Sequence, residues 1–215
     1  MGRGRFITLE GGEGAGKSTQ AKRLAAWLEG LGRKVLLTRE PGGSPGAEEI
    51  RKLLVQGAAD RWDPITETLL HFAARRDHLE RVIRPALAAG QWVLSDRFAD
   101  STLAYQGYGH GVDRGLIAAL EAAVVGSQRP DLTLILDLPV VQGLKRAGAR
   151  RGPETRYEEM ALAFHERLRQ GFLAIAAEDP QRCRVIDATA NLEAVQAKLR
   201  AAIAEKFSAE LAQVS

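Results

Sequence analysis

The chain has 215 residues, which is enough for one good-sized domain with a substantial core. Its 30 basic and 27 acidic side chains leave a net charge of only +3, too small to indicate nucleic acid as the main partner. The single Cys183 excludes an internal disulfide framework and fits a reducing, cytoplasmic compartment. No apolar run reaches the ~18 residues of a membrane span, and the one after the basic N-terminus is too short for a signal peptide.

Short apolar segments rich in Val, Ile and Leu predict strands. They are RFITLE (5–10), RKVLLTRE (33–40), QWVLSDR (91–97), DLTLILDL (131–138) and RCRVIDAT (182–189). Near-continuous apolar runs of this length are typical of strands buried on both faces of a parallel sheet.

Helical patterns lie between these strands. Helices are expected over 17–31, 47–55, 65–89 with a break, 113–125 and 191–206. From Tyr157 onward, one apolar face recurs at helical spacing through Tyr157, Met160, Ala161, Phe164 and Leu168. Alternating strands and helices predict a single α/β domain over 1–215, with a tail at 207–215 that can fray.

A glycine-rich segment joins the first expected strand to the first expected helix. Its residues are Gly11, Gly12, Glu13, Gly14, Ala15, Gly16, Lys17, Ser18 and Thr19, which match the pattern G-x-x-x-x-G-K-S. Glycines let successive backbone N–H groups converge on an anion at the positive end of a helix. Lys17 can reach the β- and γ-phosphates, and the Ser18 hydroxyl can bind Mg²⁺. The segment predicts a site for a nucleoside triphosphate.

The segment VLSDRFADSTLAYQG (93–107) indicates a second substrate. It ends an expected strand with Asp96 and Arg97, and ligands of open α/β sheets bind at the carboxyl ends of the strands. Arg97 offers a planar guanidinium suited to a second phosphate. Asp96 could orient this guanidinium or the water shell of the metal. The alternative is a surface ion pair.

The segment FAARRDH (72–78) places an aromatic ring one helical turn before an arginine in two registers. His71 precedes Arg75 in one register, and Phe72 precedes Arg76 in the other. Such a pair could hold a base and its phosphate. The alternative for Phe72 is a simple place in the core.

Together these segments resemble a known family. EGGEGAGKST (10–19), TREPGG (38–43), FAARRDH, DRFADSTLAYQG and RPDLTLILDL (129–138), in this order and spacing, resemble thymidylate kinases of the bacterial type, and the resemblance covers residues 5–205. It implies a P-loop nucleoside monophosphate kinase fold, with a five-stranded parallel sheet flanked by helices and a small lid. It also implies transfer of the γ-phosphate of ATP to dTMP, with Mg²⁺, in a homodimer.

The resemblance also implies roles for individual residues. Residues from Gly11 to Thr19 would hold the ATP phosphates, and Ser18 and Asp96 would lie at the Mg²⁺. Glu13 is expected near the 3′-hydroxyl of the acceptor sugar, and Lys17 and Arg97 are expected to act with it in catalysis. The acceptor site would comprise Glu13, Arg51, Phe72, Arg75, Arg97, Ser101, Thr102, Tyr105 and Gln106. Within it, Arg75 is the matching arginine and Phe72 the stacking candidate, while His71 stands where phenylalanine is usual.

The segment KRAGARRGPETR (145–156) is the expected lid. It follows a strand whose end should face the site, and its glycines and proline allow a hinged excursion. The phosphate loop has Glu13 and no arginine, and in this pattern of the family the lid arginines act on the transferring group. One of three arginines is therefore expected to be catalytic, with Arg150 and Arg151 ahead of Arg156. The alternative is a solvated basic loop.

Two other functions stay open at this stage. The first is a nucleoside monophosphate kinase acting on UMP or CMP. The second is a switch or binding module that uses the phosphate loop only to sense ATP. The two arginine-bearing acceptor segments argue against a switch, which needs no second phosphate site.

Overall fold

The computed structural model describes residues 3–58, 60–149, 156–158 and 160–212. Within them, a five-stranded parallel sheet has the order β2-β3-β1-β4-β5. The strands are β1 Phe6–Glu10, β2 Val35–Arg39, β3 Trp92–Asp96, β4 Leu132–Asp137 and β5 Cys183–Asp187. Each lies in a segment predicted as a strand, so the predicted sheet is confirmed.

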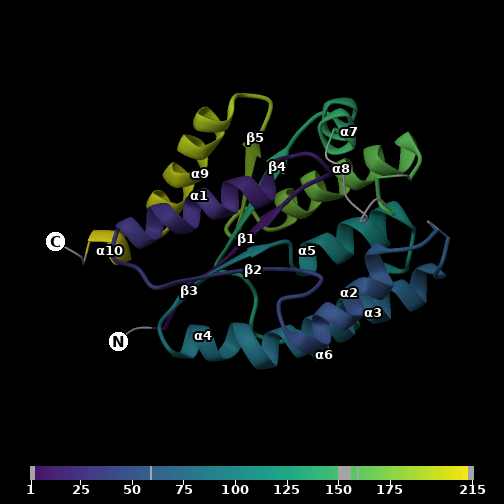
Figure 1. Ribbon diagram of the computed structural model, residues 1–215, viewed down its shortest axis with the longest axis horizontal. Helices are drawn as coiled ribbons and strands as arrows, with labels where there is room; N and C mark the ends of the chain where they lie inside the picture. The colour runs from purple at the N-terminus through teal and green to yellow at the C-terminus, as the bar shows by residue number, and fades with distance from the viewer. Residues whose placement is uncertain (1–2, 59, 150–155, 159, 213–215) are drawn as a thin grey trace.

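Helices surround this sheet on both faces (Figure 1). They are α1 Lys17–Gly30, α2 Pro45–Val55, α3 Pro64–His78, η1 Leu79–Ile83, α4 Arg84–Ala88, α5 Ala99–Thr102, η2 Leu103–Gly109, α6 Arg114–Val124, α7 Val140–Gly148, α8 Leu162–Glu178, α9 Leu192–Lys206 and α10 Ser208–Leu211. The segments η1 and η2 are π-helical. None of the described helices is long and apolar enough to cross a membrane.

Strand β1 divides the core into two layers. Neighbouring side chains of a strand point to opposite faces, so Ile7 packs with Leu24 of α1 and Leu199 of α9, while Phe6 packs in a different cluster with Leu79 of η1. In Figure 1, α1 and α9 accordingly lie on one side of the sheet and α3, α4 and α6 on the other.

The strand order places a crevice at the carboxyl ends of β1 and β3. These strands are hydrogen-bonded neighbours, with Leu9 opposite Asp96. The chain leaves β1 for α1 on one face and leaves β3 for α5 on the other, because Ala99 packs in the cluster of Phe6. Open α/β sheets bind ligands at such a divergence.

The break expected within 65–89 is confirmed. It is the π-helical η1, which ends at Ile83, two residues before Pro85, a residue with no N–H for a regular helical bond. Other elements differ from the sequence expectations. Helix α8 begins at Leu162, so Tyr157 and Met160 precede it, although both still pack against its apolar face. Helix α7 extends to Gly148 and thus covers the start of the expected lid, while 150–155 lie outside the described residues.

Candidate active site

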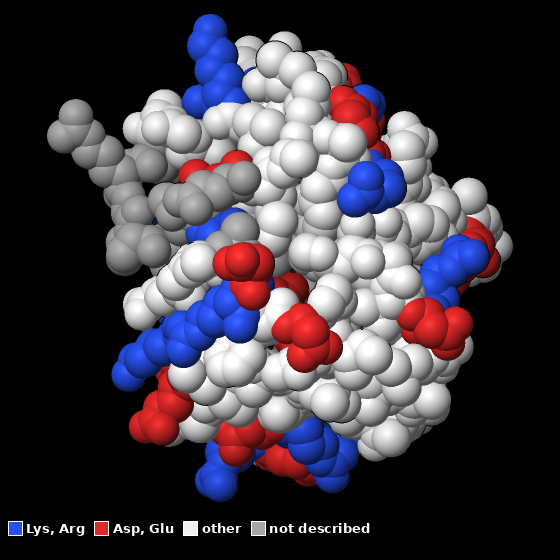
Figure 2. All heavy atoms as spheres, turned by 90° about the vertical axis from the view of Figure 1, so that its right-hand side faces the viewer, with Lys and Arg blue, Asp and Glu red and all other residues white. Residues whose placement is uncertain are grey.

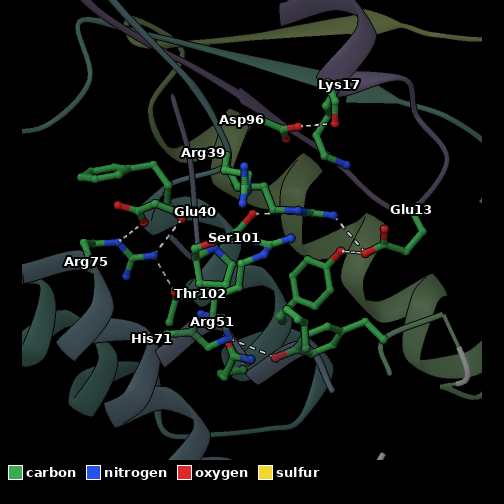
Figure 3. Close-up of a pocket in the computed structure, with 18 of the residues that line it drawn as sticks. Glu13, Lys17, Arg39, Glu40, Arg51, His71, Arg75, Asp96, Ser101 and Thr102 are labelled. Carbon is green, nitrogen blue, oxygen red and sulfur yellow. Dashed lines mark hydrogen bonds and ion pairs between the residues drawn. The ribbon is translucent and has the colours of Figure 1, made fainter. Parts of the chain in front are cut away.

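A cavity of about 200 Å³ opens at the carboxyl ends of β1, β2 and β3. In Figure 3, Lys17, Asp96 and Glu13 lie toward one side of it, and Arg75, Thr102 and His71 toward the other. The predicted site residues that line the cavity are Glu13, Gly14, Gly16, Lys17, Ser18, Arg51, Arg75, Asp96, Arg97, Ser101, Thr102, Tyr105 and Gln106. Segments far apart in the sequence thus meet at one place.

The phosphate loop is held tightly against its neighbours. Gly14 has φ +68°, and a Cβ there would lie 2.0 Å from the carbonyl oxygen of Gly143 in α7. At Gly11, with φ +128°, a Cβ would lie 2.4 Å from the carbonyl oxygen of Leu136. Both positions therefore require glycine. Of the loop residues predicted to bind ATP, Gly11, Gly12, Ala15 and Thr19 do not line the cavity.

Lys17, the first residue of α1, folds back over this loop. Its Nζ donates to the carbonyl oxygens of Gly11 (2.9 Å) and Gly12 (2.7 Å). Burial, together with the charge of Arg97, lowers the pKa of Lys17 to about 8, although nearby carboxylates oppose this shift. Lys17 is thus a buried amine whose charge is only partly stabilised by these contacts, and a phosphate beside it would stabilise the charge further.

Ser18 and Asp96 approach each other beside Lys17. The Ser18 hydroxyl donates to Asp96 Oδ2, so an alcohol from the first turn of α1 and a carboxylate from the end of β3 share one point of the cavity wall. Oxygen ligands of this kind suit Mg²⁺, which usually takes only one or two carboxylates and keeps its other positions for water and phosphate. Among the described residues no cluster of three or more His, Cys, Asp or Glu side chains could hold a metal.

Arg97 connects the phosphate loop to the acceptor side. It has φ +72°, an unusual value for a residue with a Cβ. Its guanidinium donates to the carbonyl oxygen of Gly11 (3.0 Å), to Ser101 Oγ (3.2 Å) and to Glu13 Oε1 (2.9 Å), and it lies 4.9 Å from the centre of the Tyr105 ring. A strained backbone held by so many contacts is typical of a functional position.

Glu13 is the carboxylate that contacts Arg97 and Tyr105. It accepts hydrogen bonds from Arg97 and from the Tyr105 hydroxyl on the same oxygen, Oε1. Burial alone would raise its pKa, but Arg97 and Lys17 outweigh burial and lower the pKa to about 2. Glu13 is therefore a carboxylate at neutral pH.

Glu10, at the end of β1, holds two residues of the cavity wall, Phe98 and Ser101, in place. Its side chain accepts the backbone N–H of Phe98 (2.7 Å) and the Ser101 hydroxyl (2.5 Å), which fixes the start of α5 against β1. Burial and the charge of Asp100 raise the pKa of Glu10 to about 8. Glu10 was not predicted to belong to the site, because in the sequence it is the last position of an apolar strand.

At the acceptor end, Arg75 of α3 is buried and ordered. Nε donates to Glu40 Oε2 (2.8 Å), and Nη2 donates to Thr102 Oγ1 (3.0 Å) and to the carbonyl oxygen of Phe98 (3.1 Å). Glu40 is itself fixed by His78 Nδ1 at 3.0 Å. Arg75 Nη1 is buried and has no hydrogen-bond partner among the described residues, so one donor is left for a ligand.

The structure corrects the expectation for Phe72. Neighbouring helix positions differ by about 100°, so His71 and Phe72 cannot both face the cavity. His71 lines it, whereas Phe72 is 2% exposed and packs with Val112 and Ile117 in the core. The imidazole of His71 lies 3.0 Å from the hydroxyl of Tyr157, and burial, followed by the charge of Arg75, lowers its pKa to about 3. His71 is thus an uncharged ring on the cavity wall.

Arg156 also differs from its expected place. It does not line the cavity, its side chain is 1% exposed, and it pairs with Glu67 of α3. It also donates to the carbonyl oxygens of Leu54 (3.1 Å) and Ala58 (3.0 Å). An arginine held in this way cannot reach the phosphate loop without breaking a buried ion pair, so its assignment to the lid is corrected here. Arg150 and Arg151 lie outside the described residues.

Sequence reasoning missed several residues of the cavity wall. They are Arg39, Glu40, Pro41, Val55, Phe98, Tyr157 and Glu158. A signal existed for Arg39, Glu40 and Pro41, because TREPGG follows an expected strand and its carboxyl end faces the site. Tyr157 had none, since its spacing suggested a helix face.

Comparison with known proteins identifies the family. A family model described as thymidylate kinase matches residues 9–199. A thymidylate kinase of Caulobacter vibrioides is 62% identical over 207 residues, which are 96% of this chain and 99% of that protein. This chain belongs to the thymidylate kinase family.

Other members of the thymidylate kinase family agree in sequence and structure. A thymidylate kinase of Nitrobacter winogradskyi is 54% identical over 95% of this chain and 90% of its own length. The crystal structure of thymidylate kinase from Ehrlichia chaffeensis superposes with a TM-score of 0.78 at 34% identity, over 94% of this chain and 99% of that one. The P-loop nucleoside monophosphate kinase fold expected from the sequence is therefore confirmed.

Proposed function

We propose that this protein transfers the γ-phosphate of ATP to dTMP, giving ADP and dTDP for dTTP synthesis. The observation that supports this most directly is a single cavity with two chemically different ends, in a chain of the thymidylate kinase family. One end has the phosphate loop with Lys17. The other end has an aromatic ring and two buried polar atoms that have no hydrogen-bond partner among the described residues.

These two atoms fit the edge of thymine. Arg75 Nη1 is an unpaired donor and Gln106 Oε1 an unpaired acceptor among the described residues, and both side chains line the cavity. Thymine presents a carbonyl oxygen at position 4 beside a ring N–H at position 3. Cytosine presents an amino group and a bare ring nitrogen there, which reverses both roles. Mismatched buried polar groups are costly, so the pair favours thymine or uracil over cytosine.

The charged groups between the two ends would hold the reacting phosphates. Lys17 would exchange its carbonyl contacts for the β- and γ-phosphates of ATP, where its charge stabilises oxygens that gain negative character. Arg97 and Arg51 would bind the acceptor phosphate, and Glu13 would lie at the 3′-hydroxyl of its sugar. Ser101, Thr102 and Tyr105 would contact the nucleoside.

Mg²⁺ would be held by Ser18, with Asp96 binding directly or through its water shell. The ion would neutralise charge on the transferring phosphates. Arg150 and Arg151 are the lid arginines that we expect to complete this neutralisation, by analogy with arginine fingers.

One assay separates this function from its alternatives. ADP release should be measured with ATP, Mg²⁺ and each of dTMP, dUMP, dGMP, CMP and UMP. We expect dTMP to be the preferred acceptor. Phosphorylation of CMP or UMP without dTMP would indicate another monophosphate kinase, and ATP hydrolysis that no nucleotide stimulates would indicate a switch.

Assembly and location are further parts of the proposal. A homodimer is supported by exposed apolar side chains on two adjacent helices, Leu53 of α2 with Ile65 and Leu69 of α3. On the face in Figure 2, acidic and basic side chains are interspersed among uncharged ones, as expected for a protein that does not bind nucleic acid. The single, buried Cys183 supports a cytoplasmic location. Light scattering in solution would test the dimer.

A further inference from the structure

Behind the acceptor pocket, a buried carboxylate contacts a residue of the pocket wall. Glu67 of α3 is 1% exposed. Its Oε1 accepts Gln106 Nε2 at 2.7 Å, and its Oε2 pairs with Arg156 Nη1. His110 Nε2 lies 3.8 Å from Oε1, beyond hydrogen-bond distance. Glu67 itself does not line the cavity, and it contacts two residues that do: Gln106 through this hydrogen bond, and the hydroxyl of Tyr157, whose pKa is raised by burial and by the charge of Glu67. Of these two, Gln106 carries the unpartnered acceptor.

The chemistry of this contact determines how the amide of Gln106 is turned. The ionised carboxylate of Glu67 is an acceptor only, so the –NH₂ of Gln106 must face it. If the amide of Gln106 were flipped, its oxygen would face the Glu67 carboxylate, and two acceptor oxygens would then oppose each other in a site without solvent. Loss of a hydrogen bond to a charged group is equivalent to a tenfold to hundredfold change in equilibrium constant. Gln106 Oε1 is therefore left as an acceptor for a ligand.

Arg156 stabilises the charge of the Glu67 carboxylate in the protein interior. A buried charge needs an opposite charge and satisfied hydrogen bonds. Arg156 supplies the charge and is itself anchored on the carbonyl oxygens of Leu54 and Ala58. The pair thus connects the end of α2, helix α3 and the pocket wall, with no contact to the phosphate loop among the hydrogen bonds described.

We propose that Glu67 is a positioning residue that fixes the amide of Gln106, so that the site accepts the ring N–H of thymine or uracil and rejects cytosine. This rests on the proposed function, because it assumes that a pyrimidine monophosphate occupies the cavity. Glu67 acts on base selection and not on phosphate transfer.

The test compares Glu67→Gln with the parent enzyme. A glutamine at 67 can present either its oxygen or its –NH₂, so both orientations of Gln106 find a partner and cytosine can be accommodated. dUMP and dCMP are the probes, because they share the sugar and differ in the base edge that is read. Calorimetry should give the ratio of their Kd values, and we expect Glu67→Gln to lower the dCMP-to-dUMP ratio at least tenfold, about 1.4 kcal/mol. Some preference should remain, since Arg75 still opposes the amino group of cytosine.

Arg156→Lys is the matched control. It disturbs the same ion pair but keeps a positive charge and the carboxylate of Glu67, so stability should fall while the Kd ratio stays within threefold of the parent value. Where Glu67→Gln does not fold because Arg156 loses its partner, the double variant Glu67→Gln/Arg156→Met restores charge balance and should show the same loss of selectivity.

Three outcomes would overturn the proposal. A folded Glu67→Gln or double variant with the parent Kd ratio would remove the role of Glu67. If Arg156→Lys changed the dCMP-to-dUMP ratio of Kd values as much as Glu67→Gln does, the effect would come from general damage to the structure and not from the orientation of Gln106. A parent enzyme that binds dCMP as tightly as dUMP would contradict the orientation of Gln106. Failure of the proposed function is distinct, because the parent enzyme would then release no ADP with dTMP.

Discussion

Substitution of Arg97 by alanine should weaken dTMP binding far more than ATP binding. A charge-assisted hydrogen bond to phosphate contributes about 1.5–3 kcal/mol, and about 1.4 kcal/mol corresponds to a tenfold change in affinity. Loss of the guanidinium should therefore raise the Kd for dTMP roughly tenfold to hundredfold. The Kd for ATP should stay within about threefold, because Arg97 contacts the phosphate loop through the carbonyl oxygen of Gly11 and the carboxylate of Glu13 and leaves the backbone N–H groups of the loop untouched.

The same substitution should reduce stability in a way that depends on pH. The pKa of Glu13 is about 2 in the folded protein and 4.5 in an unperturbed glutamate. This lowering contributes at most about 3 kcal/mol to the free energy of unfolding at neutral pH. Because the folded pKa is lowered, this stability is present above pH ~4.5 and is lost as the pH falls toward 2. Arg97→Ala removes a main cause of this lowering, so its stability should decrease at pH 7 and its acid sensitivity should become weaker.

Arg97→Gly provides the matched control. At φ +72° a Cβ costs about 1–2 kcal/mol, and glycine avoids this cost while losing some entropy on folding. The glycine variant should therefore be about 0.5–1 kcal/mol more stable than the alanine variant, with the same weak dTMP binding. Urea unfolding at pH 7 and pH 4, with calorimetry for both nucleotides, measures all of these quantities. Unchanged dTMP affinity, or an alanine variant as stable as the glycine variant, would refute this account.

Three further predictions concern other parts of the site. ATP affinity should fall as the pH rises above about 8, because Lys17 of the free enzyme then loses its proton. The variant Lys17→Met should bind ATP weakly at every pH and should lose most phosphate transfer. The pKa of Glu10 is raised to about 8, so its contribution to stability is complete below about pH 4.5 and lost as the pH rises through 8; urea unfolding of Glu10→Gln should show no such loss. Arg150→Ala or Arg151→Ala should lower kcat at saturating substrates by roughly 10³ or more, and a double variant within twofold of the parent kcat would exclude a lid arginine there.

Much of the architecture followed from local patterns. The central strands β1, β3 and β4 are buried along nearly their whole length and must be apolar there, so each was visible as a short Val-, Ile- and Leu-rich run. The edge strands β2 and β5 are more exposed but have similar apolar runs. The phosphate loop was visible because Gly11 and Gly14 adopt backbone angles and close contacts that exclude other residues. The apolar runs and the backbone angles are local features that a single sequence records directly, whereas the close contacts of Gly11 and Gly14 are made with Leu136 and Gly143, far along the chain.

The missed features depend on partners distant in the sequence. Either His71 or Phe72 could face the site on helical spacing, and the choice is made by Val112 and Ile117, which form an apolar pocket for Phe72. Arg156 reads as part of a solvated basic run, yet its partner Glu67 lies 89 positions earlier in α3. A buried ion pair between two such positions leaves no local trace in the sequence.

Among the described residues, Lys17, Arg51 and Arg97 of the site have protein partners, and this affects how substrates bind. Lys17 contacts the carbonyl oxygens of the phosphate loop, Arg97 contacts Glu13, and Arg51 donates to the carbonyl oxygen of Pro41 at 2.6 Å. A phosphate that enters must replace these contacts, so its affinity is the difference between two sets of hydrogen bonds and not the sum of the new ones. Lys17 and Arg97 both donate to the carbonyl oxygen of Gly11, and this shared acceptor partly offsets the repulsion between the two cations. Arg75 Nη1 and Gln106 Oε1 differ in that neither has such a partner among the described residues. Base recognition should therefore contribute more to affinity, per hydrogen bond formed, than phosphate recognition does.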